Sequence, residues 1–370
     1  MQNLMSPLTP YEEIILNLRS LFGRYGYTHC QVGPFEQYDY YLQNRSALPG
    51  EQVLIFTDAD GSLTALKPDV TMSLVKNVKD SQQGLKKLCY DENIYRIPTG
   101  GASFRESVQT GLECIGQLDD YAVGEVLMLA LKSLASIKKN YILNLSHVDL
   151  MDGLLDLALP DGGDRMPIMR AIGQKNLSAL GQACETLAVS PKYQQALETL
   201  TTLYGPIRDT LPQVEALAQG EKMESACREL AVIRDLMEAY GLGDHLYLDF
   251  SVRGGTDYYS GPVFLGYVDN AAGPVLSGGR YDKLIRRMGK QAGGIGFAVS
   301  LDQLERSGRQ QLDTDILLIY ENTVPAATVI RTVANLKQDG LRVRAERQLP
   351  DDCRYGRLLK LTEEGVSELG

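Results

Sequence analysis

Apolar side chains near the start of the chain recur every three or four positions, which predicts an amphipathic helix. They are Ile14, Ile15, Leu18, Leu21, Phe22 and Tyr25. Thr9 and Glu12 have the spacing of a capping box, and Gly26 suits the helix end. Residues 28–32, which precede Gly33 and Pro34, then have the composition of a strand.

Beyond this helix, short runs of alternating apolar and polar residues predict strands. Asp60 and Gly61 separate two of these runs and favour a hairpin turn. The strands are expected over residues 53–58, 62–66, 87–97, 104–117 and 141–145. Strands and short connections therefore dominate the first part of the chain.

The middle and the end of the chain follow different patterns. Helical periodicity covers residues 121–139 and most of 147–243, so both ranges are expected to be helical. From residue 314 a strand, an amphipathic helix and a second strand form a βαβ pattern. We therefore expect a core domain over 1–313 and a partial α/β domain over 314–370.

Composition narrows the class of protein. A hydrophobic content of 44% with 23% charged residues is ordinary for a globular protein, and the net charge of −10 argues against broad binding to nucleic acid or anionic membranes. No apolar run reaches the length of a membrane span. The six cysteines are scattered and only three histidines are present, so no metal site or cofactor is expected and a cytoplasmic location is predicted.

Candidate chemistry lies on the strand over 104–117. Gln109, Gly111 and Glu113 share one face, and the glycine between the two polar side chains leaves room for a small ligand. A carboxylate aimed into a sheet needs a partner, so the alternatives for Glu113 are a ligand, an internal salt bridge or an exposed face. Tyr259 and Tyr281 lie in glycine-rich strands, where they either contact a ligand or fill space.

Several motifs, in order, resemble those of one family. They are Leu-Lys-Pro-Asp-Val-Thr at 66–71, Gln-Thr-Gly-Leu-Glu at 109–113, Arg-Gly-Gly-Thr-Asp-Tyr-Tyr at 253–259, Gly-Gly-Arg-Tyr-Asp at 278–282 and Gly-Phe-Ala at 296–298. The set resembles the histidine-binding core of histidyl-tRNA synthetases, and still more their paralogue, the regulatory subunit of ATP phosphoribosyltransferase. The resemblance implies an α+β fold of class II synthetase type, with an antiparallel sheet of six or seven strands flanked by helices. It also implies that the helical region over about 147–243 is an insertion, and that 314–370 is a partial α/β domain similar to the start of an anticodon-binding domain.

The resemblance also implies a site. Asp69, Thr71 and Gln109 match the groups that hold the amino group of histidine, while Glu113, Tyr259 and Tyr281 match those around its imidazole. Arg96 and Arg253 are possible anion-binding residues. The alternative for Asp69 is that it only caps the helix after it. For His147, which precedes a helical run, a structural or capping role is favoured over catalysis.

Three departures from the synthetase pattern fall on the groups that handle ATP. Pro98 stands where motif 2 has a glutamate, and Gln303 stands where motif 3 has an arginine. Gly254 takes the place of the catalytic arginine, with Arg253 one residue earlier. An amide cannot replace a guanidinium that stabilises charge on a transferred phosphate. We therefore expect no catalytic residue and no aminoacylation.

The prediction is a non-catalytic regulatory subunit of ATP phosphoribosyltransferase in histidine biosynthesis. Its expected partners are the short-form catalytic subunit and histidine as the feedback effector, in a homodimer within a hetero-octamer. The alternatives are a divergent histidyl-tRNA synthetase and a stand-alone histidine-binding paralogue. A tRNA partner is not expected, and arginines of the tail such as Arg342, Arg344 and Arg357 suit a solvated face or a protein contact better than RNA.

Overall fold

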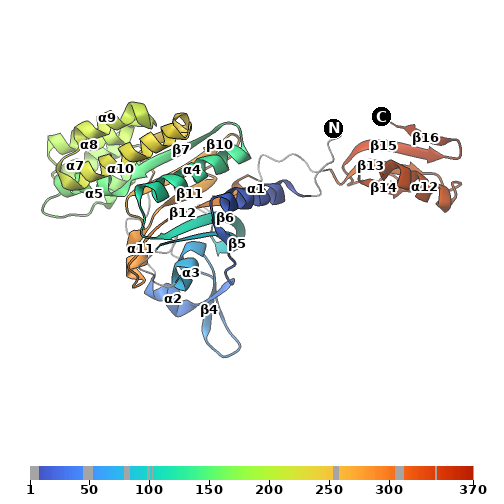
Figure 1. Cartoon of the computed structure of the whole chain (residues 1–370), viewed down its shortest axis with the longest axis horizontal. Coiled ribbons are helices and arrows are strands. Elements are labelled where there is room, and N and C mark those ends of the chain that lie inside the picture. Colours follow the sequence, from blue (N-terminus) through green and yellow to red (C-terminus); the bar gives the residue numbers. More distant parts are fainter. Residues whose placement is uncertain are drawn as a thin grey trace. The chain divides into compact units, whose positions relative to one another are not determined.

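The computed structural model describes residues 8–44, 53–78, 84–97, 101, 103–252, 258–304, 312–337 and 340–369 (Figure 1). The chain divides into two compact units. The larger spans Ile14–Arg306, and the smaller contains Ser307–Gly370 with the N-terminal residues up to Glu13.

A nine-stranded sheet forms the centre of the larger unit, counted over the described residues. Its order is β1-β5-β6-β12-β11-β10-β7-β9-β8. The strands in that order are Thr28–His29, Leu85–Arg96, Arg105–Gly116, Gly293–Ser300, Leu276–Arg280, Pro262–Val268, Tyr141–His147, Leu246–Asp249 and Tyr204–Pro206. The strands from β5 to β7 pair antiparallel, as expected. The expected number of six or seven strands was too low, because short strands extend both edges and two of them, β1 and β9, pair parallel.

Helices α1 (Pro10–Arg24) and α4 (Asp120–Ile137) pack on one face of this sheet. The ring of Phe22 on α1 meets that of Phe297 on β12 edge-on, with centroids 5.8 Å apart. On α4, Leu134 packs against Gly266 of β10 so closely that a β-carbon there would lie 2.8 Å from it. Both N-terminal signals of α1 are confirmed, since Thr9 and Glu12 exchange the two hydrogen bonds of a capping box.

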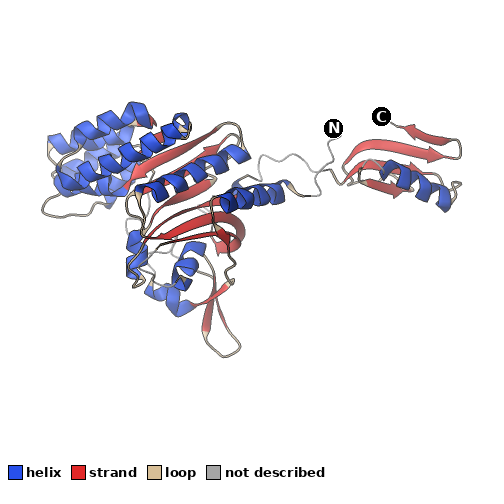
Figure 2. Cartoon of the chain, in the orientation of Figure 1, coloured by secondary structure: helices blue, strands red, loops and turns tan. Residues whose placement is uncertain are grey.

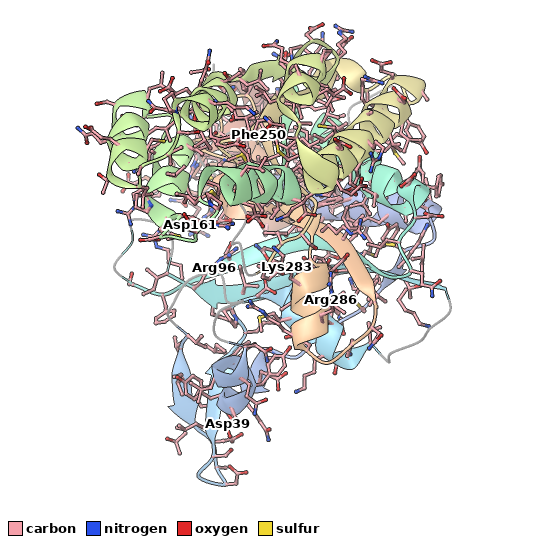
Figure 3. The ribbon with its side chains drawn as sticks, turned by 90° about the vertical axis from the view of Figure 1, so that its left-hand side faces the viewer. Asp39, Arg96, Asp161, Phe250, Lys283 and Arg286 are labelled. Carbon is pink, nitrogen blue, oxygen red and sulfur yellow. The ribbon has the colours of Figure 1, made fainter. Side chains whose placement is uncertain are left out.

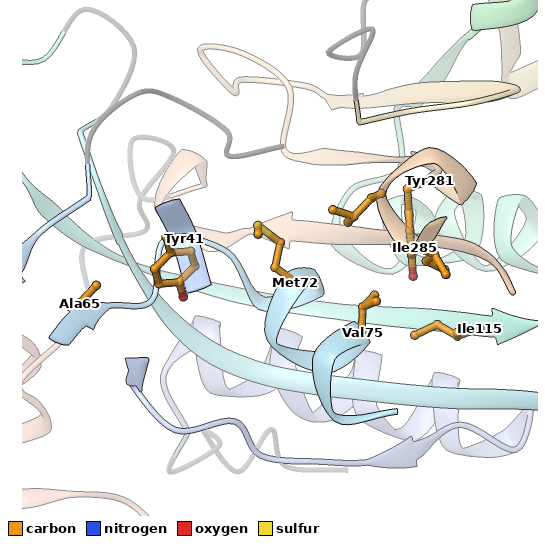
Figure 4. Packing of buried hydrophobic residues seen from close by; sticks show 8 residues of the cluster. Tyr41, Ala65, Met72, Val75, Ile115, Tyr281 and Ile285 are labelled. Atoms are coloured by element: carbon orange, nitrogen blue, oxygen red, sulfur yellow. The ribbon is translucent and has the colours of Figure 1, made fainter. Parts of the chain in front are cut away.

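The opposite face is covered by two short helices, α3 (Val70–Asn77) and α11 (Asp282–Arg287). Met72 and Val75 of α3 pack with Tyr281 and Ile285, over Ile115 of β6 (Figure 4). Lys290, just after α11, donates to the Val75 and Val78 carbonyl oxygens at the end of α3. The two helices are therefore held together at one end, while their N-termini lie near the candidate site.

Further elements flank α3. The predicted hairpin at Asp60-Gly61 is confirmed, with Gly61 at φ +85°. The hairpin belongs to a three-stranded sheet ordered β2-β4-β3. A short helix, α2, follows β2 in the sequence and precedes β3. The bounds are β2 Phe35–Gln37, α2 Tyr38–Gln43, β3 Ile55–Thr57 and β4 Leu63–Leu66.

Helices fill the region between β7 and β9, where the sequence predicts the insertion (Figures 1 and 2). They are α5 Val148–Ala158, α6 Met166–Gly173, α7 Leu177–Thr186, α8 Pro191–Thr202, α9 Ile207–Leu217 and α10 Gly220–Ala239. Helix α10 packs against α5, α4 and α9. A short helix, η2 (Gly243–His245), leads back into β9. The insertion and the nine-stranded sheet therefore belong to the same compact unit.

The smaller unit contains the predicted βαβ pattern, since β13 and β14 pair parallel on either side of α12. Two more strands extend this sheet to the order β14-β13-β15-β16. The bounds are β13 Thr314–Tyr320, α12 Ala326–Leu336, β14 Val343–Glu346, β15 Tyr355–Thr362 and β16 Gly365–Glu368. Three of its arginines form ion pairs within the unit, namely Arg342–Asp315, Arg344–Glu346 and Arg357–Glu368.

Candidate functional site

Glu113 is the centre of the candidate site. It lies on β6 with only 1% of its surface exposed. Thr71 Oγ1 donates a hydrogen bond to its Oε1 at 2.6 Å, and Tyr281 Oη donates to its Oε2 at 2.5 Å. Three sequence-predicted residues, from β6, α3 and the start of α11, are thus in direct contact. Neither donor carries a positive charge, so the two hydroxyls position the carboxyl group without neutralising it.

Glycines on neighbouring strands make room for these side chains. Gly296 on β12 lies opposite Glu113, and a β-carbon at that position would lie 1.9 Å from Glu113 Oε2. A β-carbon on Gly294 would lie 2.2 Å from the Tyr281 ring, and one on Gly279 would lie 2.8 Å from the ring of Tyr259. Contacts this short do not occur between real atoms, so the glycine-rich motifs provide the space in which the polar and aromatic groups lie.

Asp69 stands at the N-terminus of α3, two residues before Thr71. Its Oδ1 accepts a hydrogen bond from the Met72 backbone N–H at 2.9 Å, so the capping interpretation is confirmed. The same position brings its charge within electrostatic reach of Glu113. Capping therefore does not conflict with a place at the site, because the helix N-terminus fixes Asp69 beside Glu113.

Aromatic rings surround the two carboxyl groups. Tyr259 stacks at a tilt on Tyr258, with ring centroids 4.6 Å apart, and Tyr258 lies 6.1 Å from the Tyr281 ring. Tyr258 was not predicted as a site residue, although its place in the Tyr-Tyr pair is the signal that identifies it. Tyr90, also missed, is buried on β5 with its hydroxyl against Gly111. Tyr90 is placed at the site because it pairs with Gly111 across β5 and β6. The sequence of one strand does not reveal which residue of the next strand it pairs with.

The electrostatics of the site disfavour negative charge. Burial raises the pKa of Glu113 to about 8, and the charge of Asp69 acts in the same direction, against the hydrogen bonds from Thr71 and Tyr281. Burial also raises the pKa of Asp69, although the Met72 N–H and the charge of Arg96 partly oppose it. Two carboxyl groups with raised pKa values form a site suited to a cationic or hydrogen-bond-donating ligand.

Gln109 lies on the same face of β6, four residues from Glu113, as the period of two predicts. Its Nε2 is 3.4 Å from Ser300 Oγ, which is a long hydrogen bond, and the side chain is 5% exposed. Nearby, Ser107 donates to Asp302 at 2.8 Å. The described polar groups at this end of β12 thus pair with β6, and the structure does not join Gln109 directly to the Glu113 cluster.

Of the two arginines predicted as possible anion-binding residues, the structure describes Arg96 but not Arg253. Arg96 ends β5 and lies below the insertion helices in Figure 3. Burial raises the pKa values of Asp69 and Tyr259, and the charge of Arg96 is near enough to oppose that rise in part. Among the described residues it forms no ion pair. Arg253 and Gly254 lie outside the described residues, as do Pro98 and the side chain of Gln303.

The described residues contain no cluster of three or more metal-ligating side chains, and no helix among them is both long and apolar enough to cross a membrane. His147 does not cap α5 with its side chain, which instead contacts Glu229. His147 is thus the N-cap residue of α5 by position, but its side chain makes no capping hydrogen bond.

The fold and these motifs define a class II synthetase-like protein. The sequence model of the histidyl-tRNA synthetase family matches residues 6–304, and the chain belongs to that family. Curated relatives carry the name ATP phosphoribosyltransferase regulatory subunit, as the motifs predict. The relative from Alkaliphilus metalliredigens is 28% identical over 287 residues, covering 76% of this chain and 72% of its own length. The one from Clostridium kluyveri is 27% identical and covers 88% and 86%.

Solved structures agree with this fold. A protein from Bacillus halodurans, titled ATP phosphoribosyltransferase regulatory subunit/histidyl-tRNA synthetase, has a TM-score of 0.74 at 24% identity, over 94% of this chain and 91% of that one. A chain of the ATP phosphoribosyl transferase (HisG:HisZ) complex from Thermotoga maritima has a TM-score of 0.61 at 18% identity, over 78% and 96%. The predicted α+β, class II synthetase-like fold is confirmed.

Proposed function

We propose that this chain is a non-catalytic regulatory subunit of ATP phosphoribosyltransferase, which activates a short-form catalytic subunit and carries the histidine site for feedback inhibition. Two lines of support favour this function. The curated relatives are named as that subunit, and a relative in the same fold comes from a complex of that enzyme. The second is the pair of carboxyl groups, Asp69 and Glu113, which form no ion pair with another described residue, at a site that suits an amino acid with an imidazole side chain.

In the proposed complex, histidine binds with its imidazole against Glu113, Tyr281 and Tyr259. Its amino group lies toward Asp69 and Thr71, with Gln109 at the far end of the same strand face. Arg96, which forms no ion pair with another described residue, holds the ligand's carboxylate, and Arg253 is proposed for the same role. The site offers hydrogen-bond acceptors and π-faces to a donor-rich ligand, which is the chemistry that histidine presents.

The observation that carries the proposal is the buried carboxyl group of Glu113, whose hydrogen-bond partners among the described residues are the hydroxyls of Thr71 and Tyr281. Calorimetry with L-histidine, on the wild type and on Glu113→Ala, tests this proposal. We expect the wild type to bind L-histidine and the variant to bind it at least about tenfold more weakly. Co-elution with the short catalytic subunit tests the partnership separately. Equal affinity of the variant and the wild type would remove Glu113 from the site, and failure to co-elute would contradict the partnership.

A divergent histidyl-tRNA synthetase is the second candidate, because the matching family model carries that name. Histidine-dependent exchange of pyrophosphate into ATP distinguishes the two functions. We expect no exchange, since Pro98 and Gln303 replace groups that grip ATP in the family. The paired arginines of the tail likewise disfavour tRNA, because Asp315, Glu346 and Glu368 already neutralise them.

A further inference from the structure

The helical insertion contacts the sheet through a buried histidine. His147 lies at the end of β7, just before α5, and is 1% exposed. Its Nε2 is 3.0 Å from Glu229 Oε2 on α10. Its Nδ1 is buried and has no hydrogen-bond partner among the described residues. Among the described residues, the hydrogen bond to Glu229 is therefore the one that links this imidazole to the insertion.

Glu229 also contacts Arg280, the last residue of strand β11. Arg280 Nη1 donates to Glu229 Oε1 at 3.3 Å, while Arg280 Nε donates to Asp282 Oδ2 at 2.9 Å. One planar guanidinium thus bridges the insertion and the start of α11, which a lysine ammonium cannot do with the same geometry. Gly261, at φ +71°, leaves the space, since a β-carbon there would lie 3.3 Å from Arg280 Cδ.

The residue after Arg280 is Tyr281, which donates to Glu113 at the candidate site. The backbone around Arg280 is fixed on both sides. Ser260 N–H donates to the Arg280 carbonyl oxygen at 2.8 Å, and Asp282 Oδ1 accepts from the Gly294 N–H at 3.0 Å. Arg280 and Tyr281 therefore share a short segment that hydrogen bonds hold on both sides.

A second charge contact reaches the same segment. Lys283 of α11 lies 3.6 Å from Asp152 of α5, and Figure 3 shows Lys283 below the insertion helices. Helices α5 and α10 therefore each form an ion pair with a residue close to Tyr281 in the sequence, Lys283 and Arg280 respectively. The exposed fractions of the Glu229 and Arg280 side chains are 24% and 28%, so water screens their pair only in part.

The charge state of Glu229 suits this role. Burial acts to raise its pKa, but the hydrogen bond and charge of His147, together with the charge of Arg280, hold the pKa of Glu229 below its ordinary value. The carboxylate is therefore ionised at neutral pH and retains both partners.

We propose that Glu229 and Arg280 are positioning residues for Tyr281, and that they link the docking of helices α5 and α10 to ligand occupancy at Glu113. This inference rests on the proposed function, because the ligand is L-histidine. Occupancy at Glu113 favours one position of Tyr281, and the Arg280–Glu229 pair transmits that preference to the insertion. Such a link requires that the ligand bind the two docked arrangements with different affinity.

The test uses the full chain, L-histidine and the variant Glu229→Gln, which keeps the side chain's shape but removes its charge. We expect L-histidine to bind about fivefold or more weakly to this variant, the lower end of usual coupling. In the wild type, L-histidine should also slow amide hydrogen exchange in α10, and Glu229→Gln should lose that protection. A purely structural role would alter exchange equally with and without L-histidine.

The matched control is Lys222→Met, which breaks the 2.9 Å ion pair between α10 and Asp156 of α5 without touching Arg280. It should keep both the affinity and the ligand-induced protection. If Glu229→Gln does not fold, Arg280→Lys provides the second test, with the same expected losses. Wild-type affinity and protection in the folded variants would overturn the coupling alone, whereas a wild type that binds no L-histidine would overturn the proposed function and the coupling together.

Discussion

Glu113 and Gly296 face each other across β6 and β12, and the carboxyl group occupies the space in which a side chain of residue 296 would begin. We predict that Gly296→Ala displaces Glu113 from Thr71 and Tyr281. The overpacking should lower the free energy of unfolding by about 1–3 kcal/mol and abolish L-histidine binding. Thermal unfolding and calorimetry measure the two effects.

Gly273→Ala is the matched control, because a β-carbon at that glycine meets no atom within 4 Å. This substitution should leave both measurements near the wild-type values. Wild-type affinity in Gly296→Ala would contradict the geometry of the site.

The raised pKa of Glu113 predicts how stability depends on pH. The unfolded carboxyl ionises near pH 4.5, whereas the folded one stays neutral up to about pH 8. The wild type should therefore lose unfolding free energy as the pH rises through this interval, by an amount on the order of several kcal/mol, and Glu113→Gln should lose less. Urea unfolding of both proteins from pH 4 to 9 measures the difference. Parallel pH profiles would show that Glu113 titrates normally.

Ligand binding should release a proton. Below about pH 8 the empty site holds Glu113 neutral, and a bound imidazole that donates to the carboxylate favours the ionised form. We expect a release approaching one proton near pH 7, with affinity that rises as the pH approaches 8. Calorimetry in buffers of different ionisation enthalpy reports the release directly. A binding enthalpy that is the same in every buffer would refute it.

Lys67 provides a prediction outside the site. Its Nζ lies 2.7 Å from Glu92 Oε2, and its side chain is 1% exposed. Both residues line a cavity of about 520 Å³ with Gly33, Pro34 and others. Because removal of one partner leaves a largely buried charge, Lys67→Met should lower the free energy of unfolding by about 3–5 kcal/mol.

The double variant Lys67→Met/Glu92→Gln should recover part of this loss. As a control, Lys76→Met removes a more exposed ion pair with Glu36 and should change stability by less than about 1 kcal/mol. Equal losses for the two single variants would contradict the assigned burial of Lys67.

Local patterns predicted the elements that local physics determines. The capping box at Thr9, the hairpin at Gly61 and the shared face of Gln109 and Glu113 all depend on spacing within one segment, and the structure contains each of them. The strand expected over 28–32 is shorter, because only Thr28 and His29 pair with β5.

Contacts between distant segments were not predictable in the same way. His147 and Glu229 are 82 residues apart, and neither neighbourhood indicates the other. The parallel pairing of β7 with β9 spans the whole insertion. The motifs identified Tyr281 through resemblance alone, and only the fold explains why it reaches Glu113.

The central claim is that this chain activates a short-form catalytic subunit and responds to histidine. The most direct measurement is phosphoribosyl-ATP formation by the catalytic subunit from the same genome, with and without this protein, across a titration of L-histidine. We predict activation by this protein that L-histidine reverses, with the reversal lost in Glu113→Ala. No activation, with both proteins folded and mixed at micromolar concentration, would contradict the account.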